Sequence, residues 1–141
     1  MKLPENLSAR TSYLLGRAAS RVQVLGERDL EPLGITPREY SVLAVLAERS
    51  PLSQTQVAEI LGLDRTTILK LGAALDRKRL VVRQRDTNDA RAYAMALTPA
   101  GDRLCAEAFE LLLACEARFL TPLKPNEREQ LHNLLARLTD L

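Results

Sequence analysis

The chain has 141 residues, 46% of them hydrophobic, and a formal net charge of +2. This length and hydrophobic content suit one domain with a buried core, or a small domain with helical extensions, and argue against a disordered chain. No apolar run approaches the roughly 20 residues of a membrane-spanning helix, and the first residues lack the apolar core of a signal peptide. We therefore expect a cytoplasmic protein.

The first predicted element is one long amphipathic helix over roughly residues 7–30, in which apolar residues recur at helical spacing with arginines between them. A second helix should begin at Thr36-Pro37-Arg38-Glu39, because this run combines an N-cap, a proline at the first helical position and a capping-box glutamate. We expect this helix to continue through Ala47 and to bury Tyr40, Leu43, Ala44 and Leu46.

A helix-turn-helix is predicted next. After Ser50-Pro51 there is room for one short strand at Leu52, and Ser53-Gln54-Thr55-Gln56 forms another capping box. The helix that follows should end at Gly62 and bury three apolar residues, Val57, Ile60 and Leu61. Asp64, an N-cap candidate, comes only two residues after the glycine, so two helices meet across a tight turn.

The second of these helices has two distinct faces at 100° per residue. The inward face carries Ile68, Leu71 and Leu75, and the opposite face is small and cationic, with Thr66, Lys70, Ala73 and Arg77. Two strands follow, with alternation at Val82, Gln84, Tyr93, Met95 and Leu97 and a polar turn at residues 86–89. Such a helix can enter a major groove, and a thin ribbon carrying arginine can reach phosphates or the minor groove.

Positive charge is concentrated in this segment. Between Leu61 and Tyr93 there are eight cations and four anions, a net +4, so the rest of the chain sums to −2. A locally basic segment in a nearly neutral chain favours a localised contact with a polyanion over nonspecific electrostatic binding by the whole surface.

Two helices close the chain, the first capped by Thr98-Pro99 and running to about Leu120, the second starting near Pro125. The long apolar stripes at both termini exceed what a compact winged domain needs, which favours a homodimer interface; an intramolecular helical pair is the alternative. The predicted fold class is mainly α with a small β wing. A winged helix-turn-helix DNA-binding domain at residues 34–98 would lie between an N-terminal dimerisation helix at 1–33 and C-terminal dimerisation helices at 99–141.

Several short motifs, taken in order, extend this interpretation. They are Gly34-Ile35-Thr36-Pro37-Arg38-Glu39-Tyr40-Ser41-Val42-Leu43, Leu52-Ser53-Gln54, Val57-Ala58, Leu61-Gly62-Leu63-Asp64-Arg65-Thr66-Thr67, Leu75-Asp76, Leu80-Val81, Asp86, Asp89-Ala90-Arg91 and Leu97-Thr98-Pro99-Ala100-Gly101. In this order and spacing the chain resembles, over nearly its whole length, the MarR family of bacterial transcriptional regulators. The resemblance implies a winged helix between terminal helices that interlock two subunits. It also implies a dimer that binds pseudo-palindromic double-stranded DNA, usually repressing genes until a small ligand or an oxidant weakens binding.

The same resemblance assigns DNA-contacting positions. It gives recognition-helix positions to Arg65, Thr66, Thr67 and Lys70, and it makes Arg91 the wing-tip arginine of the minor groove, oriented by Asp89. Arg83 and Arg85 share one face of a strand, so we expect them to follow a phosphate track. The alternatives are solvated surface charges on the helix and strand, and an ordinary surface ion pair between Asp89 and Arg91.

Two positions depart from expectation. Arg79 stands where the family usually has glycine before the first wing strand, so the helix end must either tolerate a left-handed non-glycine residue or close differently. Gly72 lies inside the recognition helix, where glycine costs about 1 kcal/mol relative to alanine unless close packing requires it. We interpret it as a tight crossing against the preceding helix.

An effector is implied by the resemblance, which places ligands in a crevice between dimerisation helices and winged domain. There Tyr13, Arg17 and Tyr40 could hold a small aromatic or phenolic effector; core packing of both tyrosines is the alternative. Cys105 and Cys115 lie ten residues apart in one helical stretch, about 15 Å, too far for an intrachain disulfide. They are either two small buried hydrophobes or a redox sensor, although the family's peroxide-sensing branch uses a cysteine in the first helix, which has none here.

No cofactor or metal site is predicted. The sole histidine, His132, has no partners for a metal site or a catalytic triad, and the glycines are too scattered for a nucleotide-binding motif. We therefore expect no enzyme activity. The predicted function is a MarR-type transcriptional regulator, a repressor released from DNA by a small molecule. The alternatives are a winged-helix module for protein partners and a cysteine-based redox-responsive regulator.

Overall fold

The computed structural model describes residues 2–85 and 93–139. Its elements in chain order are α1 (Glu5–Ser8), α2 (Thr11–Leu30), the 3-10 helix η1 (Glu31–Leu33), α3 (Pro37–Glu48), β1 (Leu52–Ser53), α4 (Gln54–Leu61), α5 (Arg65–Arg77), β2 (Val81–Arg85), β3 (Tyr93–Leu97), α6 (Pro99–Phe119) and α7 (Pro125–Leu138). The predicted turn at residues 86–89, and with it Asp89 and Arg91, lies outside the described residues.

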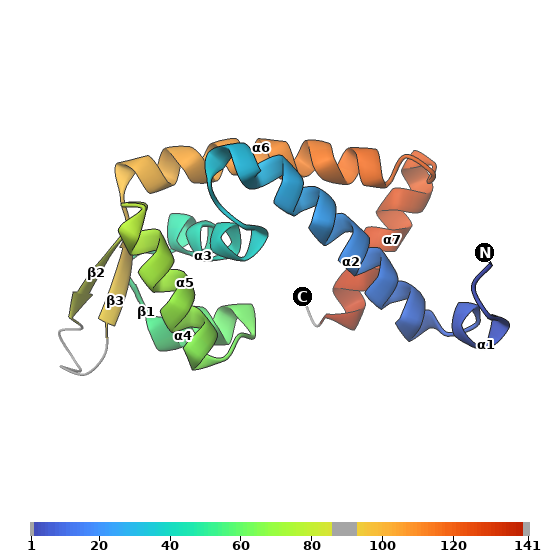
Figure 1. Cartoon of the computed structure of the whole chain (residues 1–141), viewed down its shortest axis with the longest axis horizontal. Coiled ribbons are helices and arrows are strands. Elements are labelled where there is room, and N and C mark those ends of the chain that lie inside the picture. The colour runs from blue at the N-terminus through green and yellow to red at the C-terminus, as the bar shows by residue number, and fades with distance from the viewer. Residues whose placement is uncertain (1, 86–92, 140–141) are drawn as a thin grey trace.

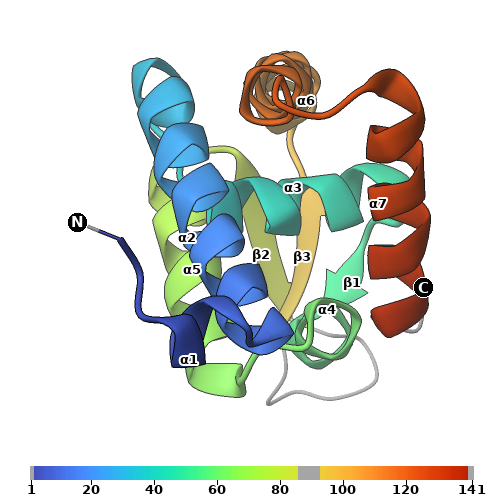
Figure 2. The ribbon, with the colours of Figure 1, turned by 90° about the vertical axis from the view of Figure 1, so that its right-hand side faces the viewer.

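The long helix α6 runs along one side of the molecule and joins its two ends (Figure 1). At one end lie α3, α4, α5 and the strands, which form the winged helix. At the other end lie α2 and α7, with α1 farthest from the strands. Seen along the molecule from that end, α2 and α7 stand on opposite sides below α6 (Figure 2). The mainly helical fold with a small β wing is thus confirmed.

Three predicted side-chain caps position the helices of the winged part. Thr36 and Glu39 exchange hydrogen bonds of 3.2 and 3.3 Å at the start of α3, and Ser53 and Gln56 do the same at the start of α4. Asp64 caps α5, and Gly62 ends α4 with a left-handed φ of 62°. Each cap satisfies backbone N–H groups that the first helical turn leaves free, and together they fix where the two helices meet.

Arg79 takes the left-handed conformation that glycine usually supplies, with φ 59°. The Arg79 N–H donates to the carbonyl of Asp76 at 2.9 Å, and the Leu80 N–H donates to the carbonyl of Leu75 at 3.0 Å. This pair of bonds is the Schellman closure of a helix end. Of the two alternatives predicted for this position, the structure has the first: α5 tolerates a left-handed non-glycine residue and turns directly into β2.

The three strands form an antiparallel sheet in the order β1-β3-β2. The register pairs Arg83 with Met95 and Val81 with Leu97, and directly opposed residues share one face of a sheet. Val81 and Met95 on this face are buried, whereas Val82 is 44% exposed. The predicted alternation placed Val82 on the inward face of β2. The buried apolar residue of this strand is instead Val81, one position earlier. The predicted short strand at Leu52 is confirmed as β1, which pairs with β3.

The core lies where α3, α5 and α6 meet the sheet and the end of α2. It contains Leu30, Ile35, Val42, Leu43, Leu46, Val57, Ile68, Leu75, Leu80, Val81, Met95, Cys105 and Ala108. Most of the predicted inward residues belong to it or pack against it, but Ile60 is 51% exposed. That prediction is wrong because Val57 and Leu61 set the inward face of α4, and Ile60 lies about 100° around the helix from Leu61.

Two further expectations are corrected. The helix predicted over residues 7–30 is interrupted, because Arg10 has an extended backbone between α1 and α2. Gly72 was expected to cross the preceding helix tightly. A Cβ at Gly72 would lie 3.8 Å from Nε2 of Gln54, the first residue of that helix, but the closer neighbour is in the wing, Met95 Sδ at 3.0 Å. The glycine therefore chiefly permits close packing between α5 and β3.

Candidate nucleic-acid interface

The N-terminal turn of α5 is held by Asp64. One carboxylate oxygen accepts the Thr67 N–H at 2.8 Å, and the other accepts the Thr67 hydroxyl at 2.6 Å. The hydroxyl bond, followed by the backbone bond, lowers the pKa of Asp64, so the cap is a charged carboxylate at neutral pH. The cap fixes the direction in which the first residues of α5 leave the turn.

The outward face of α5 is exposed and basic. Arg65, Thr66, Lys70 and Arg77 are exposed, whereas Thr67 is half-buried. Because the Thr67 hydroxyl donates to Asp64, its hydrogen is already committed and only its oxygen lone pairs remain free. Of the two threonines predicted to address base edges, Thr66 is therefore the better placed.

Leu69 is a residue of this face that sequence reasoning missed. Its side chain is 41% exposed, and it lies three residues after Thr66 and four after Arg65, which puts all three on one side of the helix. An apolar side chain at such a position can contact a thymine methyl group in the major groove. The same helical periodicity that selected Thr66 and Lys70 would have found it.

The two basic residues of β2 differ in their surroundings. Arg83 Nε lies 3.1 Å from Asp76 Oδ2 of α5, and the Arg83 guanidinium carbon lies 6.0 Å from the centre of the Tyr93 ring. Arg85 is exposed and lies opposite Tyr93 in the register. Both arginines share the face of the sheet that includes Met95. The predicted wing residues Asp89 and Arg91 lie outside the described residues.

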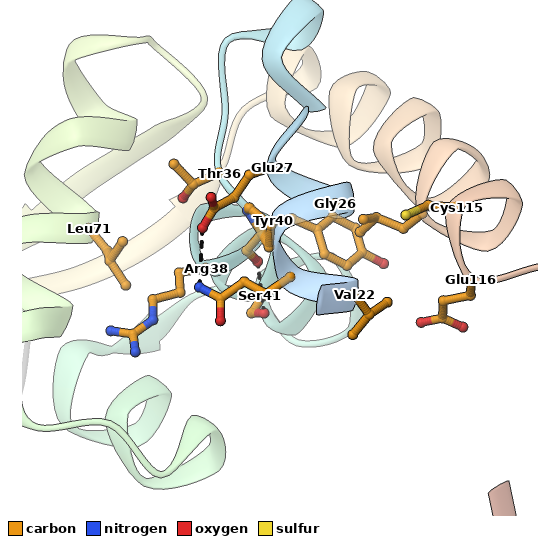
Figure 3. A pocket seen from close by; sticks show the side chains of 13 residues that line it. Val22, Gly26, Glu27, Thr36, Arg38, Tyr40, Ser41, Leu71, Cys115 and Glu116 are labelled. Atoms are coloured by element: carbon orange, nitrogen blue, oxygen red, sulfur yellow. Dashed lines mark hydrogen bonds between the residues drawn. The ribbon is translucent and has the colours of Figure 1, made fainter. Parts of the chain in front are cut away.

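A pocket of about 530 Å³ opens between α2, α3, α5 and α6, and Tyr40 lines it. In Figure 3, Arg38 lies on the Leu71 side of this pocket and Glu116 at the opposite end, beyond Val22. The other two predicted effector residues, Tyr13 and Arg17, are not among the residues that line it. They belong to the first half of α2, toward α1, so the fold does not bring them to Tyr40 within one chain.

The pocket is lined by apolar residues, by uncharged polar groups and by three charged side chains, Glu27, Arg38 and Glu116. Burial raises the pKa of Tyr40, and electrostatic interactions with Cys105 and Glu116 raise it further, so the phenol is a neutral hydrogen-bonding group at neutral pH. Gln23 Nε2 donates to Glu27 Oε1 at 3.2 Å, and the Ser41 hydroxyl donates to the carbonyl of Pro37 at 3.0 Å. The pocket thus combines apolar walls with a few polar groups, as small-molecule sites do.

Both cysteines are buried and free. Burial is the main cause that raises the pKa of each thiol; Asp102 adds to it at Cys105 and Asp29 at Cys115. A reactive sensor cysteine needs an accessible thiolate. Of the two alternatives predicted for this pair, these surroundings favour small buried hydrophobes.

Within residues 2–85 and 93–139, no cluster of histidine, cysteine and acidic side chains could hold a metal ion. In the same part of the chain, no helix is long and apolar enough to cross a membrane.

The terminal helices carry exposed apolar side chains. Leu14 and Leu15 of α2 and Leu134 and Leu138 of α7 are exposed, Leu138 at 70%. A groove of about 650 Å³ lies between α2, α6 and α7, lined largely by residues of this kind, and His132 is part of its wall. Exposed apolar side chains gathered along one groove favour a contact with another molecule.

Comparison with known proteins agrees with this geometry. The sequence model of the MarR family matches residues 33–92. A protein of Thauera aromatica assigned to transcriptional regulation of the hcr operon is 34% identical over 105 residues, which are 74% of this chain and 63% of the relative. The chain therefore spans somewhat less than two thirds of that relative.

Solved structures match over nearly the full length. The transcriptional repressor CouR bound to a 23-mer DNA duplex is 30% identical, with a TM-score of 0.89 and 99% of both chains covered. CouR from Rhodococcus jostii RHA1 bound to p-coumaroyl-CoA gives a TM-score of 0.82 at 29% identity, covering 96% of this chain and 95% of CouR. A MarR-family transcriptional regulator of Rhodococcus sp. RHA1 is 29% identical, with a TM-score of 0.87 and 96% of both chains covered. This chain belongs to the MarR family of transcriptional regulators.

Proposed function

We propose that the protein is a cytoplasmic, non-enzymatic repressor that binds pseudo-palindromic duplex DNA as a homodimer and leaves it when a small aromatic or phenolic effector binds. The observation that carries this proposal is the exposed basic face of α5 beside the basic strand β2. In this scheme residues 34–98 are the DNA-binding domain, and residues 1–33 and 99–141 hold the two subunits together.

The proposed contacts divide by position. Thr66 and Lys70, with Thr67 as an acceptor, address base edges in the major groove, and Arg65 lies beside them at the start of α5. Arg83 and Arg85 contact phosphates, which position a protein without reading sequence. Arg91, oriented by Asp89, enters the minor groove; this role rests on the sequence resemblance.

The dimer is proposed from the terminal helices. Exposed leucines of α2 and α7 and the groove between α2, α6 and α7 supply an apolar face that one chain leaves open. A two-fold dimer would cover this face with its own copy. It would also present two α5 helices to one duplex, which is why the predicted operator is pseudo-palindromic.

The effector site is proposed at the pocket that contains Tyr40. The pocket lies between α2 and α6 on one side and α3 and α5 on the other, so a molecule held there touches both proposed parts of the protein. CouR binds p-coumaroyl-CoA, and a phenolic effector would suit the neutral phenol and apolar walls here. Tyr13 and Arg17 remain candidates only if the partner subunit brings its copies to this pocket.

Selection of bound duplexes from a random DNA pool tests the proposal. We expect enrichment of a pseudo-palindrome, and binding that falls steeply with added salt because several phosphates are neutralised. Arg91→Ala should weaken binding by about tenfold or more, since a base-directed arginine contributes about 1–3 kcal/mol. No enrichment, or affinity that does not change with salt, would contradict the proposal.

The effector is tested separately with the selected duplex. Free p-coumarate and p-coumaroyl-CoA serve as probes, and displacement of the protein from DNA is the readout. Tyr40→Phe keeps the ring and removes only the hydroxyl, so it should lower the potency of a phenolic effector and leave DNA affinity unchanged. If Tyr40→Phe responds like the parent protein to an active probe, the effector does not use this phenol.

A further inference from the structure

The recognition helix α5 and the wing meet along a narrow seam. Met95 of β3 is fully buried there, and a Cβ on Gly72 would lie 3.0 Å from Met95 Sδ and 4.0 Å from Arg83 Cδ. Arg83 is paired with Met95 in the register, so its aliphatic stem lies on the side of the sheet that α5 covers. The guanidinium of Arg83 therefore leaves the protein between helix and wing rather than from the open face of the ribbon.

Asp76 holds this guanidinium from the helix side. It lies one turn after Gly72 on α5, and its Oδ2 is 3.1 Å from Arg83 Nε. The Tyr93 ring lies 6.0 Å from the guanidinium carbon. Arginine has five N–H donors in a rigid plane, and this contact uses the one on Nε. The contact leaves the four donors of the two Nη atoms unused, and it holds the plane that contains them from the helix side.

The pair is not explained by stability alone. The Arg83 side chain is 30% exposed and the Asp76 side chain 41%, and ion pairs this accessible contribute little to folding. A carboxylate beside a surface that binds phosphates also opposes binding by its charge. The Asp76 carboxylate at the seam is better explained by the orientation that it imposes on the Arg83 guanidinium.

We propose that Asp76 is a positioning residue for DNA binding: it fixes the plane of Arg83 so that both Nη atoms face one phosphate at the seam between recognition helix and wing. A planar guanidinium held in one orientation can bind a phosphate through two parallel hydrogen bonds. This inference rests on the proposed function, in which Arg83 contacts the DNA backbone. It adds that the contact depends on a residue of α5.

A role of Asp76 through its charge and a role through positioning Arg83 predict opposite results for the substitution Asp76→Asn. Asp76→Asn removes a negative charge near the DNA, so if Asp76 acts only through its charge, the variant binds the duplex more tightly. If Asp76 positions Arg83, the variant binds more weakly. We expect a loss of about fivefold, equal on all duplexes tested, and a fall of about 1 in the number of phosphates given by the salt dependence.

The experiment uses the full chain and the duplex selected from the random pool, with affinity measured across a range of KCl concentrations. Arg83→Gln should show the same loss of affinity and of salt dependence, and Asp76→Asn should add nothing to it, because the two residues act on one contact. Glu107→Gln, which removes one exposed negative charge from α6, is the matched control and should not weaken binding.

Asp76→Glu provides a second variant that keeps the charge and suits a helix. It displaces the carboxylate by one methylene, so we expect about twofold to threefold weaker binding with an unchanged net charge. The inference is overturned if Asp76→Asn tightens binding or leaves the salt dependence unchanged, if its effect adds to that of Arg83→Gln, or if Asp76→Glu binds like the parent. Absence of salt-dependent binding by the parent protein would instead overturn the proposed function.

Discussion

Glu39 and Lys78 join the start of α3 to the end of α5, with Lys78 Nζ 2.7 Å from Glu39 Oε2. The Glu39 side chain is 8% exposed and that of Lys78 is 38% exposed. The same Oε2 accepts the Thr36 N–H at 3.3 Å in the capping box of α3. One buried carboxylate therefore fixes α3, which lines the Tyr40 pocket, beside the end of the helix proposed to contact DNA.

Replacing Lys78 by methionine should destabilise the protein by about 1–3 kcal/mol, because it leaves the buried carboxylate of Glu39 without its cation. The cost stays below that of a fully buried pair because Lys78 is partly exposed. Unfolding in urea measures it, and adding Glu39→Gln should recover part of the loss. The exposed pair of Arg49 and Glu48, 3.8 Å apart, supplies the control: Arg49→Met should cost less than about 0.5 kcal/mol. Equal costs for the two variants would show that the burial of Glu39 has no energetic consequence.

Gly101 is the position where the wing meets α6 most tightly. A Cβ there would lie 2.1 Å from the carbonyl oxygen of Leu80 and 2.9 Å from Leu97 Cδ1. That oxygen also accepts the Thr98 N–H at 3.1 Å, so it cannot move aside without breaking its bond to the N-cap residue of α6. We expect Gly101→Ala to cost about 2–3 kcal/mol, as overpacking does, measured by thermal or urea unfolding. The exposed neighbour Ala100 should accept serine with little change, and a similarly small effect at Gly101 would contradict this packing.

Most of the fold could be predicted because its signals are local. The caps at Thr36, Ser53 and Asp64 bond N–H groups three residues away, so sequence alone contains both partners. The partner of Gly72 is different, since Met95 lies on β3, the second strand of the wing, and the contact depends on the register of β2 and β3. No local pattern fixes that register, which is why Met95 could not be identified from the sequence as the closer neighbour of Gly72.

The candidate site also has features that local sequence predicts and features that depend on tertiary structure. The exposed face of α5 follows from helical spacing, and even the missed Leu69 is recoverable from it. The bond between Asp76 and Arg83 joins a helix to a strand, and Tyr40 is separated from Tyr13 because α2 extends away from the winged part; both depend on tertiary structure. The DNA-contacting roles of Arg65, Lys70 and Arg91 remain predictions.

Arg79→Gly should stabilise the protein. A left-handed φ of 59° costs a non-glycine residue about 1 kcal/mol, while glycine adds entropy to the unfolded chain, so the expected net gain is about 0.5 kcal/mol. The midpoint of thermal unfolding measures it. Arg77→Gly, inside the last turn of α5, should instead lose about 1 kcal/mol. If both variants are less stable than the parent, the Arg79 side chain makes contacts that stabilise the protein by more than its backbone strain destabilises it.

The thiols of Cys105 and Cys115 should be nearly unreactive in the folded protein. Burial raises the pKa of both, so at neutral pH they are protonated as well as inaccessible, and thiolate is the reactive form. A coloured disulfide reagent at neutral pH should label them at least about a hundredfold faster after unfolding in urea than before. Rapid labelling of either thiol in the native protein would restore the redox-responsive alternative.

Acid should weaken the cap of α5 within a narrow pH range. Hydrogen bonds from Thr67 lower the pKa of Asp64 in the folded protein, so the folded state favours the carboxylate. The stabilisation is complete above the unfolded pKa of about 3.9 and is lost as the pH falls through the lower folded pKa. The difference in unfolding free energy between the parent and Asp64→Asn should therefore be constant near neutral pH and shrink below about pH 4. Thr67→Val removes the hydroxyl, the largest cause of the shift, so in that background the pH dependence should flatten; if it does not, another group is titrating.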